Sequence, residues 1–224
     1  MRKASPKSSD LTKQVHKLSA ALKNLPTVAN GVSIVFEEQV AIRLAGFGRQ
    51  LDEFNQLSLS FQATETWRTV YQKILETCET RRYLSVALIK SDDYWRDEPG
   101  KASLDFNYRL LDYGFTIQRI FIVDPFFWPP SAKTPAKETL DWIVAQDNRG
   151  VITSLVRLTD LQYESDLVCD IGIYGNDAVG KQVTDFDGKT VRFELHFDPA
   201  RIKEAENTWN RIQLYAVNLD ELLQ

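Results

Sequence analysis

The sequence predicts an α/β fold built on a mixed sheet, in which parallel strand-helix-strand units precede antiparallel hairpins and helices flank the sheet. Runs 84–89 and 117–123 are rich in β-branched and aromatic residues, and apolar residues between them recur at helical spacing. Two buried strands joined by a helix form a parallel pair. Three further strand-like runs, 167–174, 178–184 and 190–197, are separated by short turn sequences, which is typical of antiparallel hairpins.

Length and composition agree with one globular domain that carries an extension. The chain has 224 residues, of which 43% are hydrophobic, and this is enough for a sizeable core. No apolar run has the length of a secretory signal or a membrane span, so we expect a cytoplasmic protein with no membrane span. Cys78 and Cys169 are far apart and have no neighbouring histidine, so we expect small buried thiols.

Charge is distributed unevenly along the chain. The net charge is −4, yet residues 1–25 hold six basic side chains and one acidic side chain. We expect a flexible basic tail over residues 1–10. Such a tail could contact nucleic acid or an anionic membrane, but the acidic remainder of the chain would repel both. Nucleic acid is therefore not an expected partner.

The segment 11–62 is expected to be a helical extension. Its apolar residues alternate spacings of four and three, first over 11–25 and again over 40–61, which is typical of helices that pack along other helices. The second series is Val40, Leu44, Phe47, Leu51, Phe54, Leu57 and Phe61. The helices could form a hairpin, a coiled-coil-like pair between the subunits of a homodimer, or a layer on the sheet. The pattern does not choose among these.

The α/β domain is expected over residues 63–224, starting with a helix capped at Thr64 that leads into the first strand. After the second strand, residues 125–131 contain three prolines and the aromatic residues Phe126, Phe127 and Trp128. This loop is either a docking or stacking surface or a hydrophobic lid over the core. We then expect a helix that begins at Thr134 and ends at Gly150, followed by a strand over 151–156.

The last third of the chain is expected to form antiparallel strands and a closing helix. Gly175-Asn176 and the segment 185–189 have the composition of hairpin turns. Asp198 followed by Pro199 is a helix start. The apolar face of that helix is Ile202, Ala205, Trp209, Ile212 and Ala216.

This order of elements resembles a phospholipase D-like domain, a unit also found in bacterial signalling proteins, over about residues 67–216. Catalytic members of that family carry a histidine, a lysine two residues later and an aspartate five residues after the lysine. Matching the run at 168–175 to that motif places Val168, Asp170 and Gly175 at these positions. The resemblance therefore implies a degenerate unit, or pseudoenzyme, that lacks the groups for phosphodiester transfer.

Other catalytic signatures are weak. The two histidines are His16, in the basic helix, and His196, which lies two residues before Asp198 near a strand end. This pair has no nucleophile motif beside it. The sequence contains no zinc spacing, phosphate-binding glycine loop, dinucleotide fingerprint or nucleophile elbow. We therefore expect no cofactor.

One group of polar residues is a candidate site, because ligands of open parallel sheets bind beyond the carboxyl ends of the strands. This group is Ser91, Asp92, Asp93, Asp124, Arg157 and Asp160, with Asp170 as a further candidate. Its carboxylates could hold magnesium, but they are equally typical of turns and helix caps. A polar crevice that binds a small ligand or a peptide without chemistry is the favoured interpretation.

These observations predict a non-catalytic regulatory or protein-interaction module, with the aromatic loop and the strand-end cluster as its working surfaces and a protein as its expected partner. The alternative is a metal-dependent hydrolase or nuclease that uses the strand-end carboxylates. The sequence favours a protein that is not an enzyme, but it does not exclude one.

Overall fold

A computed structural model describes residues 8–23, 34–62, 66–91, 97–185 and 190–224. The chain divides into two compact units, residues 1–49 and 50–224. Within the described residues, no helix has the length and apolar character needed to cross a membrane. The turn predicted at 185–189 and the cap predicted at Thr64 fall wholly or mostly outside the described residues.

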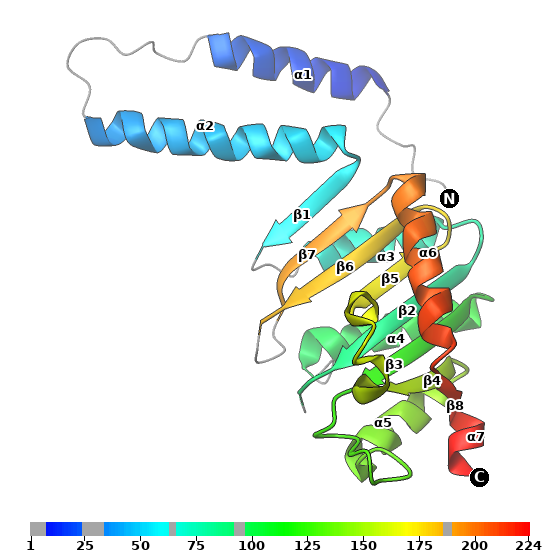
Figure 1. Cartoon of the computed structure of the whole chain (residues 1–224). Coiled ribbons are helices and arrows are strands. Elements are labelled where there is room, and N and C mark those ends of the chain that lie inside the picture. The colour runs from blue at the N-terminus through cyan, green and yellow to red at the C-terminus, as the bar shows by residue number, and fades with distance from the viewer. Residues whose placement is uncertain (1–7, 24–33, 63–65, 92–96, 186–189) are drawn as a thin grey trace. The chain divides into compact units, whose positions relative to one another are not determined.

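The N-terminal unit consists of helix α1 (Ser8–Lys23) and most of helix α2 (Ile34–Asn55), as Figure 1 shows. The predicted helical character is therefore confirmed for these ranges. Large apolar side chains of both helices are exposed, among them Leu11 at 71% and Ile42 at 61%. The described residues of these two helices thus leave much of their own apolar surface uncovered.

The prediction that the second helix continues through Phe61 is wrong. Helix α2 ends at Asn55, and Leu57 adopts a positive φ of 52°, a conformation that a helix cannot contain. The chain then enters strand β1 (Ser58–Gln62), where Phe61 lies opposite Phe193. Pairing with a strand more than 130 residues later in the chain overrides the local helical spacing.

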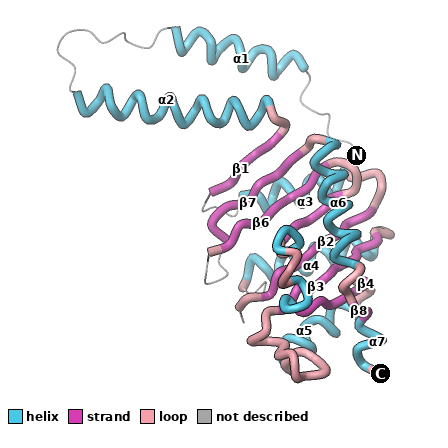
Figure 2. Tube along the Cα trace, viewed as in Figure 1, coloured by secondary structure: helices cyan, strands magenta, loops and turns pink. Residues whose placement is uncertain are grey.

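The second unit contains one sheet of eight strands with the order β1-β7-β6-β5-β2-β3-β4-β8, drawn in magenta in Figure 2. The remaining strands are β2 (Arg82–Ile89), β3 (Thr116–Val123), β4 (Ile152–Arg157), β5 (Asp170–Tyr174), β6 (Ala178–Thr184), β7 (Thr190–His196) and β8 (Val217–Asn218). Strands β2, β3 and β4 are parallel, and the other pairings are antiparallel. The mixed α/β fold that the sequence predicts is confirmed.

Helices cover both faces of the sheet, because alternate residues of each strand point to opposite sides. Helix α6 (Pro199–Gln213) packs on one face, where Trp209 and Ile212 join Val86, Ile120 and Ile173 in a buried cluster. The opposite face carries helices α3 (Thr66–Thr77), α4 (Glu98–Asp112) and α5 (Lys137–Asp147), and Figure 1 shows the two layers.

Helix starts follow the expected capping rules in one place and depart from them in another. Asp198 caps α6, since its Oδ1 accepts a hydrogen bond from the N–H of Ala200 at 2.9 Å. The predicted start at Thr134 is wrong, because α5 begins at Lys137 after Ala136, whose side chain makes no cap. The N–H of Ala136 instead donates to the carbonyl of Phe127 at 2.7 Å, which ties the helix start to the aromatic loop.

The end of the chain contains two elements that the sequence did not indicate. Strand β8 pairs antiparallel with β4, and helix α7 (Leu219–Leu223) follows it directly. Leu219 and Leu222 are buried against Phe121 and Leu155. These short elements cover the β4 edge of the sheet.

Candidate functional site

The predicted strand-end residues lie where the parallel strands β2, β3 and β4 finish. Asp124 follows β3 directly, and its N–H donates to the carbonyl of Ile89 at the end of β2 at 3.1 Å. Arg157 is the last residue of β4, and Ser91 is half-buried just beyond β2. Asp92 and Asp93 lie outside the described residues. The fold therefore brings Asp124 and Arg157 to one edge, as the parallel topology requires.

Asp124 has a structural task at this edge. Its Oδ1 accepts a hydrogen bond from the N–H of Phe126 at 2.9 Å, and its carbonyl accepts from the N–H groups of Phe127 and Trp128 at 2.9 Å each. A carboxylate that accepts from the backbone two residues later forms an Asx turn. The side chain thus starts the aromatic loop.

The aromatic loop is mostly a hydrophobic lid. Phe127 and Trp128 are only 6% and 2% exposed and belong to the core cluster beneath α5, whereas Phe126 is 79% exposed. Of the two alternatives for this loop, the structure places Phe127 and Trp128 in the lid. Phe126 is the member of the aromatic triplet that a partner could reach.

Arg157 holds this lid in place. Its Nη2 donates to the carbonyl of Ala132 at 2.6 Å, and its guanidinium lies 4.4 Å from the centre of the Trp128 ring. The indole N–H of Trp128 donates to the same carbonyl at 3.2 Å. The guanidinium of Arg157 stacks on the Trp128 ring, and both side chains donate to the carbonyl of Ala132. These contacts stabilise the loop.

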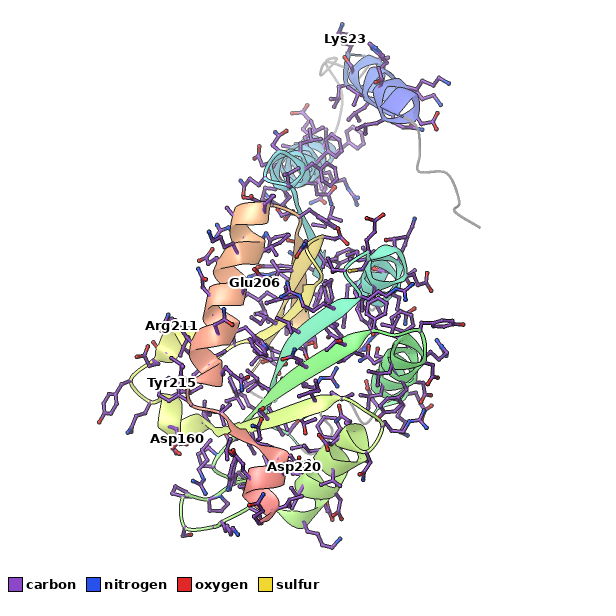
Figure 3. The ribbon with its side chains drawn as sticks, turned by 90° about the vertical axis from the view of Figure 1, so that its right-hand side faces the viewer. Lys23, Asp160, Glu206, Arg211, Tyr215 and Asp220 are labelled. Carbon is purple, nitrogen blue, oxygen red and sulfur yellow. The ribbon has the colours of Figure 1, made fainter. Side chains whose placement is uncertain are left out.

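Asp160 lies in a short 3-10 helix, η1 (Leu158–Leu161), where its side chain is exposed (Figure 3). Among the described residues, no three His, Cys, Asp or Glu side chains form a group that could hold a metal ion. Asp92 and Asp93 fall outside that statement, because they are not described. In the described part of the strand-end cluster, Asp124 forms a turn and Arg157 packs against the aromatic loop.

Asp170 lies at the start of β5, beside the carboxyl end of β2, where its Oδ2 accepts from the N–H of Leu88 at 3.3 Å. It lines a cavity of about 30 Å³ on the face of the sheet that α3 covers. The aromatic lining residues are Trp67, Tyr71, Tyr83, Tyr174 and Phe193, and the polar ones are Ser85, Arg119, Asp170 and Gln182. A cavity of this volume has room for about one or two water molecules.

Arg119 is the unexpected member of this cavity. It is 5% exposed in the middle of β3, and its Nε donates to the Ser85 hydroxyl at 2.8 Å while its Nη1 donates to the side-chain oxygen of Gln146. Sequence reasoning missed it, although a basic residue inside an apolar strand was a signal. Burying a charge requires hydrogen-bond partners, and Ser85 and Gln146 supply them.

The tyrosines around the cavity are held in their neutral form. Burial raises the pKa of Tyr71, Tyr83 and Tyr174 above the ordinary value for a phenol. At neutral pH these groups can donate hydrogen bonds but cannot act as phenolate bases. The cavity wall therefore offers polar contacts more readily than acid-base chemistry.

The three positions matched to the phospholipase D motif also have structural roles. Val168 lies before β5 and packs against the core under α6. Gly175 has a φ of +57° in the hairpin turn, and a Cβ there would come within 2.2 Å of the Cys78 sulfur. These positions serve packing and turn geometry in this fold.

A larger hollow, of about 330 Å³, lies on the opposite face of the sheet, between the first half of α6 and strands β5 to β7. Cys169 lines it, and burial raises the pKa of its thiol to about 12. That thiol is protonated at neutral pH and is a poor nucleophile. No sequence pattern indicates this hollow, because residues from four separate segments form it.

Comparison with known proteins gives likeness only at the level of solved structures. No protein-family model matches the chain, and no curated protein matches it. Nuc from Salmonella typhimurium, a phospholipase D family member, has a TM-score of 0.49 and 9% identity, covering 72% of this chain and 96% of that one.

Two further structures are similar to a comparable degree. NucT from Helicobacter pylori has a TM-score of 0.47 and 9% identity over 72% of this chain and 98% of its own. TrmBL2, an archaeal chromatin protein with a novel mode of DNA binding, has a TM-score of 0.44 and 10% identity over 96% of this chain and 71% of its own. A member of the phospholipase D family is thus among the structures to which this chain is similar, as the order of elements predicts. The TM-scores of these three structures are all below 0.5, so nothing about the chemistry of this chain follows from them.

Proposed function

We propose that this chain is a non-catalytic regulatory or protein-interaction module, and that two copies associate through helices α1 and α2. The observation that carries the proposal is the exposed apolar surface of α2. Six of its large apolar side chains are more than a third exposed, namely Val35, Phe36, Ile42, Leu44, Leu51 and Phe54. Exposed apolar surface on this scale is typical of a surface that binds another protein.

Helix α1 supplies a matching apolar surface. Leu11, Val15 and Leu22 are exposed and recur at spacings of four and seven, so they follow one side of the helix. Isolated helices of this length are marginal in water, and packing of an apolar face usually stabilises them. Association of two copies would bury the apolar faces of α1 and α2 together.

Charge supports a contact between α1 of one copy and α2 of the other. Helix α1 carries three lysines and one aspartate, whereas α2 carries four carboxylates and two arginines. Opposite net charges on two helices favour their pairing and disfavour pairing of each helix with its own copy. A second copy of the chain is therefore the partner of choice for this surface.

The structural roles of the candidate catalytic groups support the proposal that this protein is not an enzyme. Asp124 starts a turn, Arg157 clamps the loop, and the Cys169 thiol is protonated at neutral pH. His16 is exposed on α1. His196 lies 3.8 Å from Glu194, whose carboxylate also pairs with Arg192 at 2.8 Å.

The test is the mass of the full chain in solution, measured by size-exclusion chromatography with light scattering over a range of concentrations. We expect a concentration-dependent dimer that Ile42→Glu and Phe36→Glu each convert to monomer, while the thermal melting of the sheet unit is unchanged. Gln39→Glu is the matched control, because it adds the same charge at an exposed polar position of α2. A wild-type chain that stays monomeric, or a dimer that survives both substitutions, contradicts the proposal.

A further inference from the structure

The hollow between α6 and the sheet has a defined architecture. Ile171 of β5 lies opposite Lys181 of β6, and Lys181 lies opposite Glu194 of β7. These side chains share the face that α6 covers, because paired residues of neighbouring strands point to the same side. Val179 and His196 form the next pair on that face. The sheet thus supplies a floor in which apolar and charged side chains alternate.

Helix α6 forms the wall of the hollow. Arg201, Glu204, Ala205 and Thr208 line it, at spacings that place them on one side of the helix. Ala205 and Thr208 are small, whereas the deeply buried anchors of the helix are Ile202, Trp209 and Ile212. The large side chains attach α6 to the sheet. The hollow therefore lies between them, where the helix presents small side chains to the sheet.

Its volume and base suit a small organic molecule. About 330 Å³ lies at the lower end of the range for ligand pockets in proteins. Ile171 and Val179, at 8% and 5% exposure, offer an apolar base, with Cys169 and Ala205 beside them. A protonated Cys169 thiol behaves as a small apolar group. An apolar body of a ligand could lie on this base.

The charged groups around the hollow determine which polar group of a ligand can bind there. Each carboxylate that lines it has a cationic neighbour: Glu204 pairs with Arg201 at 3.0 Å, Glu194 with Arg192 at 2.8 Å and Asp166 with Arg211 at 2.6 Å. Figure 3 shows Arg211 on α6.

Lys181 differs from these cations. Within the described part of the chain, its ammonium group makes no ion pair or hydrogen bond. It is the basic group of the lining that remains available to an incoming anion.

We propose that this hollow binds a small molecule with one carboxylate and an unbranched or compact apolar body. The apolar body lies on Ile171, Val179 and Ala205, and the carboxylate pairs with the Lys181 ammonium group. The paired carboxylates at the rim disfavour a ligand with several negative charges, because like charges repel at short distance. None of the residues that line the hollow belongs to α1 or α2, so substitutions test its ligand and the proposed self-association one at a time.

The test uses octanoate as the probe and isothermal titration calorimetry of the full chain as the readout. We expect octanoate to bind the wild-type chain, and Lys181→Gln to weaken binding at least five-fold. Lys203→Gln is the matched control, since Lys203 is an exposed lysine of α6 that does not line the hollow. It should leave the affinity unchanged.

Two further measurements separate the apolar contact from the charge. Octanol, which lacks the carboxylate, should bind wild type and Lys181→Gln equally well. Ala205→Phe, which fills the hollow, should abolish binding of both probes, and circular dichroism checks that this variant is folded. The proposal is overturned by a folded wild-type chain that does not bind octanoate, or by octanoate binding that Lys181→Gln leaves unchanged.

Discussion

The carboxylate of Glu53, in the last turn of α2, accepts a hydrogen bond from the backbone N–H of Ser60 in β1 at 3.1 Å. Strand β1 is the outermost strand on its side of the sheet, and free N–H groups at such an edge promote pairing with other chains. Glu53 therefore satisfies one edge donor with its own side chain. Its backbone carbonyl also accepts from the Ser58 hydroxyl at 3.1 Å, so Glu53 makes two hydrogen bonds to β1.

Glu53→Ala should lower the free energy of unfolding by about 1 to 2 kcal/mol, because a hydrogen bond to a charged acceptor is lost. Urea denaturation measures this difference. Asp52→Ala is the matched control, since the Asp52 side chain is exposed and only its carbonyl joins the turn after α2. An equal effect of the two substitutions would show that the Glu53 bond contributes nothing.

Gly180→Ala and Gly48→Ala should change stability in opposite directions. A Cβ at Gly180 would lie 2.5 Å from the Phe193 ring and 2.7 Å from the Tyr174 hydroxyl, both of them buried. Overpacking of this kind costs about 1 to 3 kcal/mol. At Gly48, inside α2, a Cβ would meet nothing within 4 Å, so alanine should stabilise the helix by about 0.5 to 1 kcal/mol. Thermal melting of both variants checks the two signs.

Asp124→Asn should leave stability nearly unchanged, whereas Asp124→Ala should lower it by about 1 kcal/mol. Asparagine keeps the side-chain oxygen that accepts from the N–H of Phe126, and alanine removes it. Chemical denaturation of the two variants measures the difference. A metal site at this carboxylate would give a different result, with Mg²⁺ raising the melting temperature of wild type and Asp124→Asn abolishing that rise.

Trp128→Ala should destabilise the fold by about 3 to 5 kcal/mol, because it empties a buried position in the core. Phe126→Ala should stay within about 0.5 kcal/mol of wild type, since that ring is 79% exposed. Urea denaturation of both variants makes the comparison. Similar losses at the two positions would contradict the division of the loop into a buried lid and one exposed ring.

Cys169 should react with iodoacetamide at pH 8 at least about a hundred-fold more slowly in the folded chain than in urea, because the raised pKa leaves little thiolate. The folded pKa of about 12 lies above the ordinary pKa of 9.0 for a thiol, so the protonated thiol contributes stability below pH 9. That contribution is lost as pH rises from 9 towards 12. Peptide mass spectrometry follows Cys169 separately from Cys78. Equal labelling rates in both states would contradict the raised pKa.

Local sequence patterns are enough to predict the elements whose side chains repeat with a clear period. Runs at 84–89, 117–123 and 178–184 form strands β2, β3 and β6, and Asp198 caps α6 as its position before Pro199 predicts. Such local patterns suffice because strand alternation and cap hydrogen bonds involve residues that are close in the chain. The parallel pairing of β2 and β3 followed from the helix between them.

Features that depend on residues far apart in the chain could not be predicted in this way, because they arise from tertiary contacts. Phe61 fits a helical spacing equally well, but its pairing with Phe193 makes it part of a strand. Burial of Trp128 depends on Arg157 and on α5, and the partners of Arg119 are Ser85 and Gln146, on β2 and α5. The α6 hollow likewise needs β5, β6 and β7 beside the small side chains of one helix. Local propensity is worth tenths of a kcal/mol per residue, whereas burial of a large side chain is worth about 1.5 to 3 kcal/mol, so contacts between distant segments prevail.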